Sequence, residues 1–149
     1  MAMNNRALRS FIRAERVGRL ATIDPQNRPV VVPFCFVYSC EKFYSPLDEK
    51  PKSVAPGRLA RVRNIRSNPE VAIVLDHYEE DWSNLTFVLV RGRAKVILTG
   101  KEHARAVALL RRKYRQYRIM DLASRPILKI VPWKIVHWSA RKGKTEPAV

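Results

Sequence analysis

The sequence predicts a mainly β fold of the α+β type: a small antiparallel barrel of six strands with a few flanking helices. Six segments have the apolar patterns of strands, and they do not alternate regularly with helices as the strands of a parallel sheet do. The chain has 149 residues, the length of one domain, and 46% of them are hydrophobic, which is typical of a folded protein. We therefore expect a single domain over residues 1–140 and a loose C-terminal tail over residues 141–149.

The first third of the chain predicts a helix and three strands. Asn4 or Asn5 can cap the helix. The second strand, residues 29–39, is apolar on both faces, so we expect something besides the barrel core to cover it. Pro33 has no backbone N–H to donate. We therefore expect this strand either to lie at the edge of a sheet or to carry a bulge at Pro33. The expected elements are a helix with the apolar residues Leu8, Phe11 and Ile12, and strands at residues 18–24, 29–39 and 41–47.

The rest of the chain predicts two helices and three strands. Alternate residues from Val88 to Leu98 are expected to face the core, and Gly92 between them indicates a sharp bend. Thr99 and Glu102 have the spacing of a capping box that opens the second helix. The expected elements are a loop at residues 48–57, a helix at 58–67, a strand at 70–78, an acidic loop at 79–84, a strand at 85–98, a helix from 99 to about 117 with Val107, Leu110, Tyr114 and Tyr117 inward, and a strand at 126–139 interrupted at Pro132.

The charge of the chain is its most unusual property. It carries 29 Lys and Arg residues against 13 Asp and Glu, a net charge of +16, which indicates an anionic partner: nucleic acid, a membrane surface or a phosphorylated ligand. Residues 1–17 lack the apolar core of a signal peptide. The longest nearly apolar run, residues 30–38, is far shorter than the roughly 20 residues of a membrane-spanning helix. We expect a cytoplasmic protein that does not insert into a membrane.

Neither a metal site nor a catalytic side chain is expected. The three histidines are scattered, and no metal-binding spacing of Cys or His occurs. Cys35 and Cys40 cannot form a disulfide framework, so we expect reduced, packed thiols. The five glycines form neither a dinucleotide-binding motif nor a Walker loop, and no Gly-x-Ser-x-Gly motif occurs. Any chemistry is therefore expected from a bound cofactor that the protein positions.

A cluster of cations is the best local signal. It spans a loop and the start of the expected helix at residues 58–67, where free backbone N–H groups favour an anion. The cluster is either a phosphate site or a solvated basic face. The basic residues between 101 and 118 are likewise either a solvated surface or a binding face. Trp82 and Trp138 could stack on a planar ring, or belong to the core or to a dimer contact. The cations are Lys50, Lys52, Arg58, Arg61, Arg63 and Arg66.

Five segments, taken in order, carry a resemblance to a known family. They are residues 18–24 (GRLATID), 28–33 (RPVVVP), 44–52 (YSPLDEKPK), 61–69 (RVRNIRSNP) and 90–94 (VRGRA). The chain resembles the split-barrel flavin and deazaflavin oxidoreductases, the superfamily of pyridoxamine-phosphate oxidase, from about Gly18 to Trp138. Residues 48–52 (DEKPK) and 76–82 (DHYEEDW) are most similar to a subgroup of probable F(420)-dependent enzymes.

The resemblance implies a homodimer of six-stranded split barrels with two cofactors, FMN or the deazaflavin coenzyme F(420), in grooves at the dimer interface. It implies that the cofactor ring lies beside the second strand, at Val31, Val32 and Pro33. It also implies that the phosphate is bound by Ser45, Lys50, Lys52, Arg58 and Arg61. Residues 134–138 (KIVHW) lack the Arg-x-His pair of true pyridoxamine-phosphate oxidases, so oxidation of that vitamin is not implied.

Three functions are therefore consistent with the sequence. The first is an oxidoreductase that transfers a hydride between FMN or F(420) and a small organic substrate. The second is a non-catalytic cofactor carrier or sensor with the same fold. The third is a basic nucleic-acid-binding barrel, which the charge of +16 supports. Nucleic acid is the weaker expectation, because the aromatic residues are not interleaved with Lys and Arg on one strand face as stacking platforms require.

Overall fold

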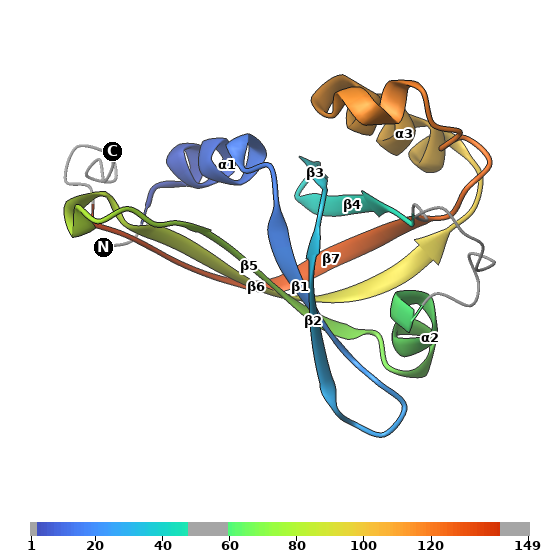
Figure 1. The fold of residues 1–149 in the computed structure, drawn as a ribbon, viewed down its shortest axis with the longest axis horizontal. Helices are drawn as coiled ribbons and strands as arrows, with labels where there is room; N and C mark the ends of the chain where they lie inside the picture. The colour runs from blue at the N-terminus through green and yellow to red at the C-terminus, as the bar shows by residue number, and fades with distance from the viewer. Residues whose placement is uncertain (1–2, 48–59, 141–149) are drawn as a thin grey trace.

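The computed structural model describes residues 3–47 and 60–140. These residues form one curled antiparallel sheet in the order β2-β1-β5-β6-β7-β4-β3 (Figure 1). The fold class is confirmed, but the expected number of six strands is wrong, because the described residues form seven. The strands are β1 (Gly18–Ile23), β2 (Pro29–Phe34), β3 (Val37–Ser39), β4 (Lys42–Pro46), β5 (Glu70–His77), β6 (Thr86–Ile97) and β7 (Ile127–Ser139).

The strand expected over residues 29–39 is divided at Cys35 and Phe36. β2 pairs with β1 at one edge of the sheet, and β3 pairs with β4 at the other edge, so the chain crosses between the two edges at this point. The backbone N–H of Phe36 does not join a ladder and donates to the Tyr114 hydroxyl at 3.0 Å. The expectation of an edge position for the strand that contains Pro33 is confirmed, since β2 is the first strand of the sheet.

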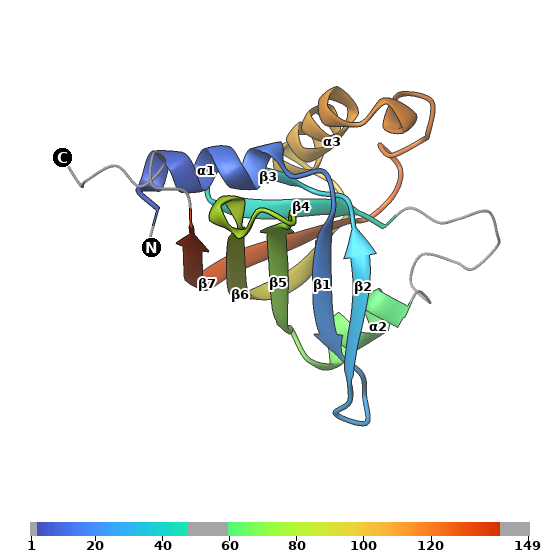
Figure 2. The same ribbon diagram turned by 60° about the vertical axis from the view of Figure 1, so that its left-hand side comes forward.

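Three α-helices flank the sheet within the described residues. α1 (Asn5–Ala14) and α3 (Lys101–Lys113) lie near β3 and β4, whereas α2 (Ala60–Ser67) lies at the opposite end of the molecule (Figure 2). The Asn4 side chain caps α1 by accepting from the backbone N–H of Ala7 at 2.8 Å, as expected. None of these helices is long and apolar enough to cross a membrane.

The capping box expected at Thr99 and Glu102 is wrong. The N-cap of α3 is Gly100, whose φ of 104° suits glycine, and no side chain caps the helix. Glu102 instead accepts from the Tyr44 hydroxyl at 2.5 Å and from the Lys129 ammonium at 2.8 Å, so contacts with β4 and β7 take the place of a local cap. The helix also ends earlier than expected, at Lys113, and a short 3-10 helix η3 (Arg115–Arg118) follows.

The core lies between the inner face of the sheet and the helices. Phe36 is at its centre, fully buried, with its ring centroid 5.4 Å from that of Phe34 and 5.5 Å from that of Phe43. A second cluster packs α3 and η3 against β3 and β4, and it includes the four residues expected to point inward from this region. Leu98, expected to face the core, is 58% exposed because β6 ends at Ile97. Cys35 is half-buried and Cys40 is exposed, so the expectation of packed thiols is wrong for Cys40.

Gly92 lies where the pairing of β6 with β7 changes register. Arg91 pairs with Lys134 and Gly92 with Pro132, which leaves Trp133 as the extra residue of a β-bulge. A Cβ atom at Gly92 would lie 2.8 Å from the carbonyl oxygen of Val131 and 3.3 Å from the Cα of Pro132. These are backbone atoms that cannot move independently of β7. A sharp bend was expected at Gly92, and the structure shows a register shift of the ladder at this position, where only glycine fits without a shift of the strand.

We expect Gly92→Ala to lower the free energy of unfolding by about 1–3 kcal/mol, because the added methyl group would push β7 away from β6. Urea denaturation of both proteins measures this difference. Lys95→Ala, an exposed position on the same strand, is the control and should change stability by no more than about 0.5 kcal/mol. An alanine at position 92 with the stability of the parent would show that the close approach to Val131 does not constrain the bulge.

Candidate functional site: the outer face of the sheet

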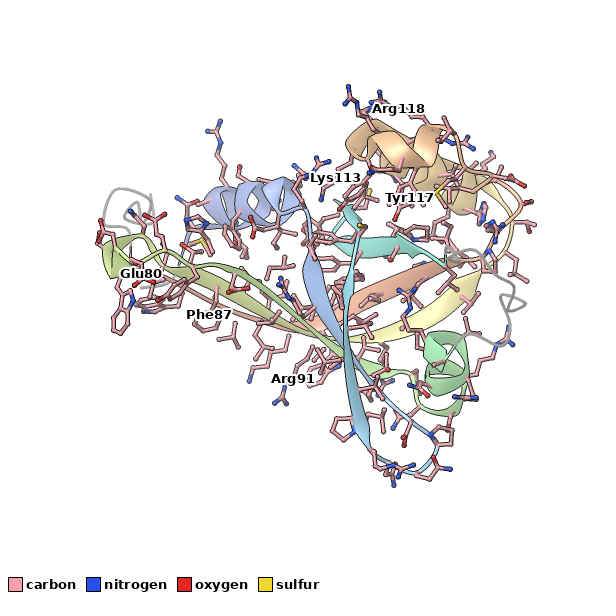
Figure 3. All side chains as sticks on the ribbon, in the orientation of Figure 1. Glu80, Phe87, Arg91, Lys113, Tyr117 and Arg118 are labelled. Carbon is pink, nitrogen blue, oxygen red and sulfur yellow. The ribbon has the colours of Figure 1, made fainter. Side chains whose placement is uncertain are left out.

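The face of the sheet that points away from α1 and α3 is not covered by any described residue. We call it the outer apolar face and define it by Val31, Phe87, Val131, Trp133, Val136 and Trp138. Residues that pair directly across neighbouring strands point to the same face of a sheet. Phe87 pairs with Trp138, and Leu89, two residues further along β6, pairs with Val136 of β7 and Val74 of β5. Figure 3 shows Phe87 and Arg91 projecting on this side, away from the helices. The exposed fraction is 63% for Val31 and 54% for Trp133.

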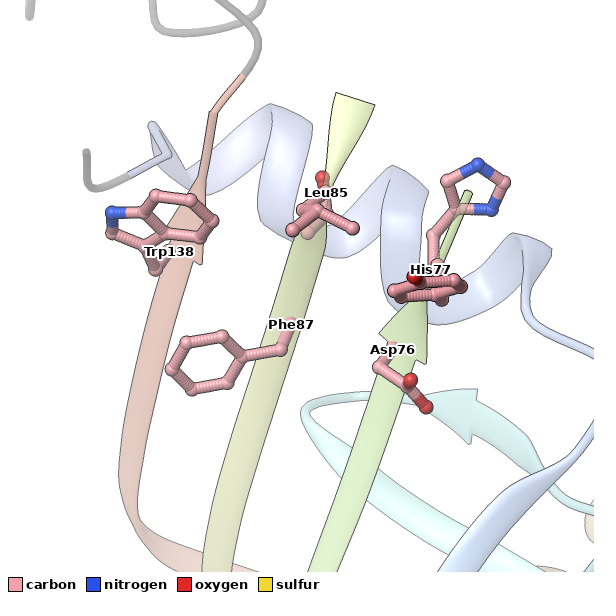
Figure 4. Close-up of a pocket in the computed structure, with 7 residues that line it drawn as sticks. Asp76, His77, Leu85, Phe87 and Trp138 are labelled. Carbon is pink, nitrogen blue, oxygen red and sulfur yellow. The ribbon is translucent and has the colours of Figure 1, made fainter. Parts of the chain in front are cut away.

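A pocket opens at one end of the outer apolar face, where β5, β6 and β7 lie side by side (Figure 4). The rings of Phe87 and Trp138 stack beside it, with centroids 6.4 Å apart and planes inclined by 28°. Its volume is about 480 Å³, which is in the range of sites for small organic molecules. The lining residues are Asp76, His77, Tyr78, Leu85, Thr86, Phe87 and Trp138.

One carboxylate, that of Asp76, lines this pocket, and a second, that of Glu79, is bonded to the lining residue His77. The Glu79 carboxylate accepts from Asn84 Nδ2 at 2.6 Å and lies 2.6 Å from His77 Nε2. The hydrogen bond to His77 is the largest cause that lowers the pKa of Glu79, so this carboxylate stays charged. The pocket therefore combines stacked aromatic rings with the carboxylate of Asp76.

The predicted ring-binding strand, β2, lies at the edge of the sheet. Val31 and Pro33 point to the outer apolar face and are exposed, whereas Val32 is half-buried and packs against the core. Within residues 3–47 and 60–140, β2 has a partner strand on one side only, so alternate backbone groups along it face away from the sheet. Apolar side chains and unpaired backbone groups of β2 are thus available to a ligand in the single chain.

The predicted phosphate-binding residues are only partly within the described residues. Lys50, Lys52 and Arg58 lie outside them. Arg61 is half-buried in the first turn of α2. Ser45 is buried, and its hydroxyl donates to the carbonyl oxygen of Cys35 at 2.7 Å.

α2 is held against the sheet by a buried polar contact. The Asn64 side chain donates from Nδ2 to Thr22 Oγ1 of β1 at 3.0 Å, and both residues are about 1–2% exposed. Val62 and Ile65 of the same helix are also buried. This packing sets the position of Arg61, which lies one turn before Asn64.

Within one chain the two predicted parts of the site are far apart. Trp138 lines the pocket at one end of the sheet, whereas Arg61 lies on α2 at the other end (Figure 1). Trp82, on the short 3-10 helix η2 (Trp82–Asn84), is 67% exposed and does not line the pocket. Trp138 and Arg61 therefore do not form one compact site within the described residues of a single chain.

Phe87 is the residue that sequence reasoning missed. It belongs to the outward set of β6 together with Leu89, Arg91 and Arg93, and an exposed aromatic ring in this set is a signal that the sequence did contain. Its contact with Trp138 was not predictable, because the two residues are 51 positions apart and meet only through the register of β6 and β7.

Comparisons with known proteins agree with this fold. The model of the family described as pyridoxamine 5'-phosphate oxidase matches residues 5–139. The chain is similar to the conserved hypothetical protein Rv2991 from Mycobacterium tuberculosis, with a TM-score of 0.80, 19% identity and coverage of 100% of this chain and 93% of that one. No curated protein matches the chain at a significant level.

Two further solved structures differ in what their names say they do. The heme storage protein HutZ from Vibrio cholerae has a TM-score of 0.67 and 17% identity, covering 91% of this chain and 94% of its own. A structure named F420 reductase has a TM-score of 0.61 and 20% identity, covering 85% of this chain and 94% of its own. At these identities the likeness shows a shared fold.

We expect Asn64→Ala to lower the free energy of unfolding by about 1–3 kcal/mol, because it removes the bond to Thr22 and leaves that hydroxyl buried. Urea denaturation measures the change. Arg63→Ala, an exposed neighbour on the same helix, is the matched control and should shift stability by no more than about 0.5 kcal/mol. Equal stabilities for the two variants would show that the Asn64 contact does not hold α2 in place.

Proposed function

Because the chain belongs to the pyridoxamine 5'-phosphate oxidase family, we propose that it is an oxidoreductase that binds a flavin-type cofactor, FMN or the deazaflavin coenzyme F(420). The proposed reaction is transfer of a hydride between this cofactor and a small organic substrate. The observation that carries the proposal is the uncovered outer apolar face, with its aromatic pocket of about 480 Å³. A soluble single chain rarely leaves so many large apolar residues on one sheet face unless the face binds something.

The described residues fit a planar tricyclic ring. Trp138 and Phe87 offer ring faces at the pocket, and β2 offers apolar side chains and backbone groups without a strand partner. Arg61 offers a guanidinium group near the start of α2, which suits the phosphate of such a cofactor. Lys50, Lys52 and Arg58 would add three cations to this group. No described side chain is assigned as an acid or base, so the proposed role of the protein is to bind and orient.

When bound, the cofactor supplies the ring that accepts or donates the hydride. In our proposal the backbone of β2 at Val31, Val32 and Pro33 sets the plane of that ring. Arg61 and the neighbouring cations fix the phosphate and so set the position of the ring along the groove. Trp138 packs against the ring from the opposite side and limits the access of water to it.

The proposal includes a homodimer joined through the outer apolar face. Arg61 and Trp138 lie at opposite ends of one chain, so the site is complete only when α2 and β2 of one copy meet the aromatic pocket of another. The same association would cover Val31 and Trp133, which are 63% and 54% exposed in the single chain. Burial of such residues is the usual driving force for obligate association.

Between the two cofactors we favour the deazaflavin. Both have a tricyclic ring, a ribityl chain and a phosphate, but F(420) continues into an acidic tail, which needs cations beyond one phosphate site. Arg63 and Arg66 are exposed on the same helix as Arg61 and are available for such a tail. A structure of similar fold is named F420 reductase, which agrees with this preference.

A cofactor carrier without turnover is the second candidate, and one observation favours it: a protein of similar fold is named a heme storage protein. Turnover of a hydride donor separates the two functions. A nucleic-acid interface at the aromatic pocket is disfavoured by the carboxylate of Asp76, since a phosphate there would lie against negative charge.

Titration of the cofactor-free protein with FMN and with F(420) at one fixed ionic strength tests the proposal. We expect a bound cofactor with its own absorption spectrum, and F(420) binding at least as tightly as FMN. FMN binding tenfold tighter than F(420), about 1.4 kcal/mol, would overturn the deazaflavin preference. Binding of neither compound at about 1 mM, which corresponds to about 4 kcal/mol, would overturn the proposed function.

Arg61→Ala is the variant for the same titration, and Arg63→Ala is its matched control because it removes an equal charge from the same helix. A charge-assisted contact to phosphate contributes about 1.5–3 kcal/mol, so Arg61→Ala should weaken FMN binding at least tenfold. Arg63→Ala should weaken FMN binding less than about threefold, since an exposed charge acts only at long range. Equal losses for both variants would mean that helix α2 attracts FMN without a specific contact at Arg61.

The dimer is tested by Val31→Lys. An unpaired charge in the proposed interface would cost about 3–5 kcal/mol, enough to raise the dimer dissociation constant more than a hundredfold. Leu98→Lys is the control, since Leu98 is exposed but lies outside the outer apolar face. Sedimentation of both variants at micromolar concentration is the measurement. A dimer unaffected by Val31→Lys, or a monomeric parent protein, would contradict the proposed interface.

A further inference from the structure

A second cavity lies on the side of the sheet opposite the outer apolar face, where α1 and α3 approach each other above β3. Its volume is about 380 Å³. Figure 3 shows Lys113 at the end of α3 that faces α1. The cavity is lined by Arg13 of α1, by Val37, Tyr38 and Ser39 of β3, and by Leu109, Arg112 and Lys113 of α3.

Three cations converge on this cavity from two helices. Arg13 and Arg112 are exposed, and neither forms a salt bridge with a carboxylate of the described residues. The nearest acids act at its margin: Glu15 influences Lys113, and Glu41 influences Tyr38, but neither lines the cavity. Like charges held together without a counter-charge repel one another, and an anion between them removes that repulsion.

Lys113 is held in a fixed position by the backbone. Its ammonium donates to the carbonyl oxygen of Glu15 at 2.6 Å and to that of Phe36 at 2.9 Å, and it lies 4.0 Å from the centre of the Phe36 ring. An ammonium has three N–H donors, so these two carbonyls leave one for a ligand. Burial, followed by the nearby charge of Arg16, lowers the pKa of Lys113 to about 8, and an anion in the cavity would raise it again.

The rest of the cavity wall is mostly apolar. Val37 and Tyr38 are buried residues of β3, and Leu109 packs against the cluster beneath α3. Burial raises the pKa of the Tyr38 hydroxyl, so it remains a neutral group near Arg13. Cations on one part of a cavity and apolar side chains on another select a molecule with both characters. An inorganic anion alone would use only the first part.

We propose that this cavity binds a small organic anion, with a carboxylate or phosphate group between Arg13, Arg112 and Lys113 and a short apolar or aromatic body against Val37, Tyr38 and Leu109. The site is separate from the proposed cofactor groove, since it lies on the opposite side of the sheet and shares no lining residue with the aromatic pocket. A test of this anion site therefore does not depend on the proposed redox function.

Amide chemical shifts of the isotope-labelled full chain, followed during titration at physiological salt, test the proposal. The probes are benzoate and phenyl phosphate, with benzamide as the neutral isostere of benzoate and inorganic phosphate as the anion without an apolar body. At least one organic anion should shift the amides of β3 and of residues 109–113, and should bind at least tenfold more tightly than benzamide and inorganic phosphate. The preferred probe identifies the head group as carboxylate or phosphate. Equal binding of benzoate and benzamide, together with no advantage of phenyl phosphate over inorganic phosphate, would overturn the proposal.

Variants locate the site. Arg13→Ala with Arg112→Ala should weaken binding of the preferred anion at least tenfold. Arg6→Ala with Arg115→Ala removes the same charge from exposed positions of α1 and η3 outside the cavity, and should weaken binding less than threefold. Equal losses in both double variants would mean that the anion responds to net charge and not to this cavity.

The pKa of Lys113 tests the site without a measurement of binding affinity. Its pKa, followed through the side-chain resonances of labelled lysine, should rise when the preferred anion is bound, because the adjacent negative charge favours the protonated ammonium. This measurement needs no substitution in the core and so avoids a variant that fails to fold. An unchanged pKa at saturating anion would show that Lys113 does not contact the ligand and would contradict the proposed geometry.

Discussion

The crossing of the chain from one sheet edge to the other, at Phe36, is the constraint on which the rest of the structure depends. Tyr114 holds this point: its hydroxyl accepts from the Phe36 N–H at 3.0 Å and can donate to the carbonyl oxygen of Arg16 at 2.8 Å. Burial raises the pKa of Tyr114 to about 12, so the hydroxyl keeps its proton under all ordinary conditions. Lys113, the preceding residue, binds the Phe36 carbonyl oxygen, so both backbone groups of Phe36 have a partner. The end of α3 thus fixes the turn that separates β2 from β3.

The two faces of the sheet have different roles because of this arrangement. The inner face is filled by Phe36 and its aromatic neighbours and is closed by α1 and α3. α1 and α3 both lie on this inner side of the sheet, so neither covers the outer apolar face. Large side chains such as Val31 and Trp133 therefore remain exposed in the single chain. In our proposal a second copy of the same face, related by a two-fold axis, covers these side chains and forms the groove for the cofactor.

Local features of the sequence were predictable, and long-range contacts were not. The cap at Asn4 and the edge position of Pro33 depend on properties of single residues, and both are confirmed. The division of the strand after Phe34 depends on Tyr114, which is 78 positions away from Phe36. Glu102 was expected to cap its own helix, but it binds Tyr44 and Lys129. Tertiary hydrogen bonds to a charged group outweigh the weak local preference for a capping box.

In the candidate site, too, single residues were predictable from the sequence and the contacts between distant residues were not. Trp138 was predictable as an aromatic ring near the end of the chain, whereas its stacking partner Phe87 is defined only by the pairing of β6 with β7. Neither the separation of Arg61 from Trp138 within one chain nor the buried contact that anchors α2 at Asn64 could be read from residue spacing. The sequence indicated which residue types our proposed cofactor site would use, and the topology separates Arg61 from Trp138 within one chain, which is why the proposal includes a second copy.

The central claim is that cofactor binding requires two copies of the chain joined through the outer apolar face. Serial dilution of the cofactor-bound protein tests it most directly, with sedimentation following the dimer and cofactor fluorescence following the bound ligand. At a free cofactor concentration held constant, our account predicts that the cofactor is released over the same range of protein concentration in which the dimer dissociates. A 17.3 kDa monomer that retains its cofactor with unchanged affinity would contradict it.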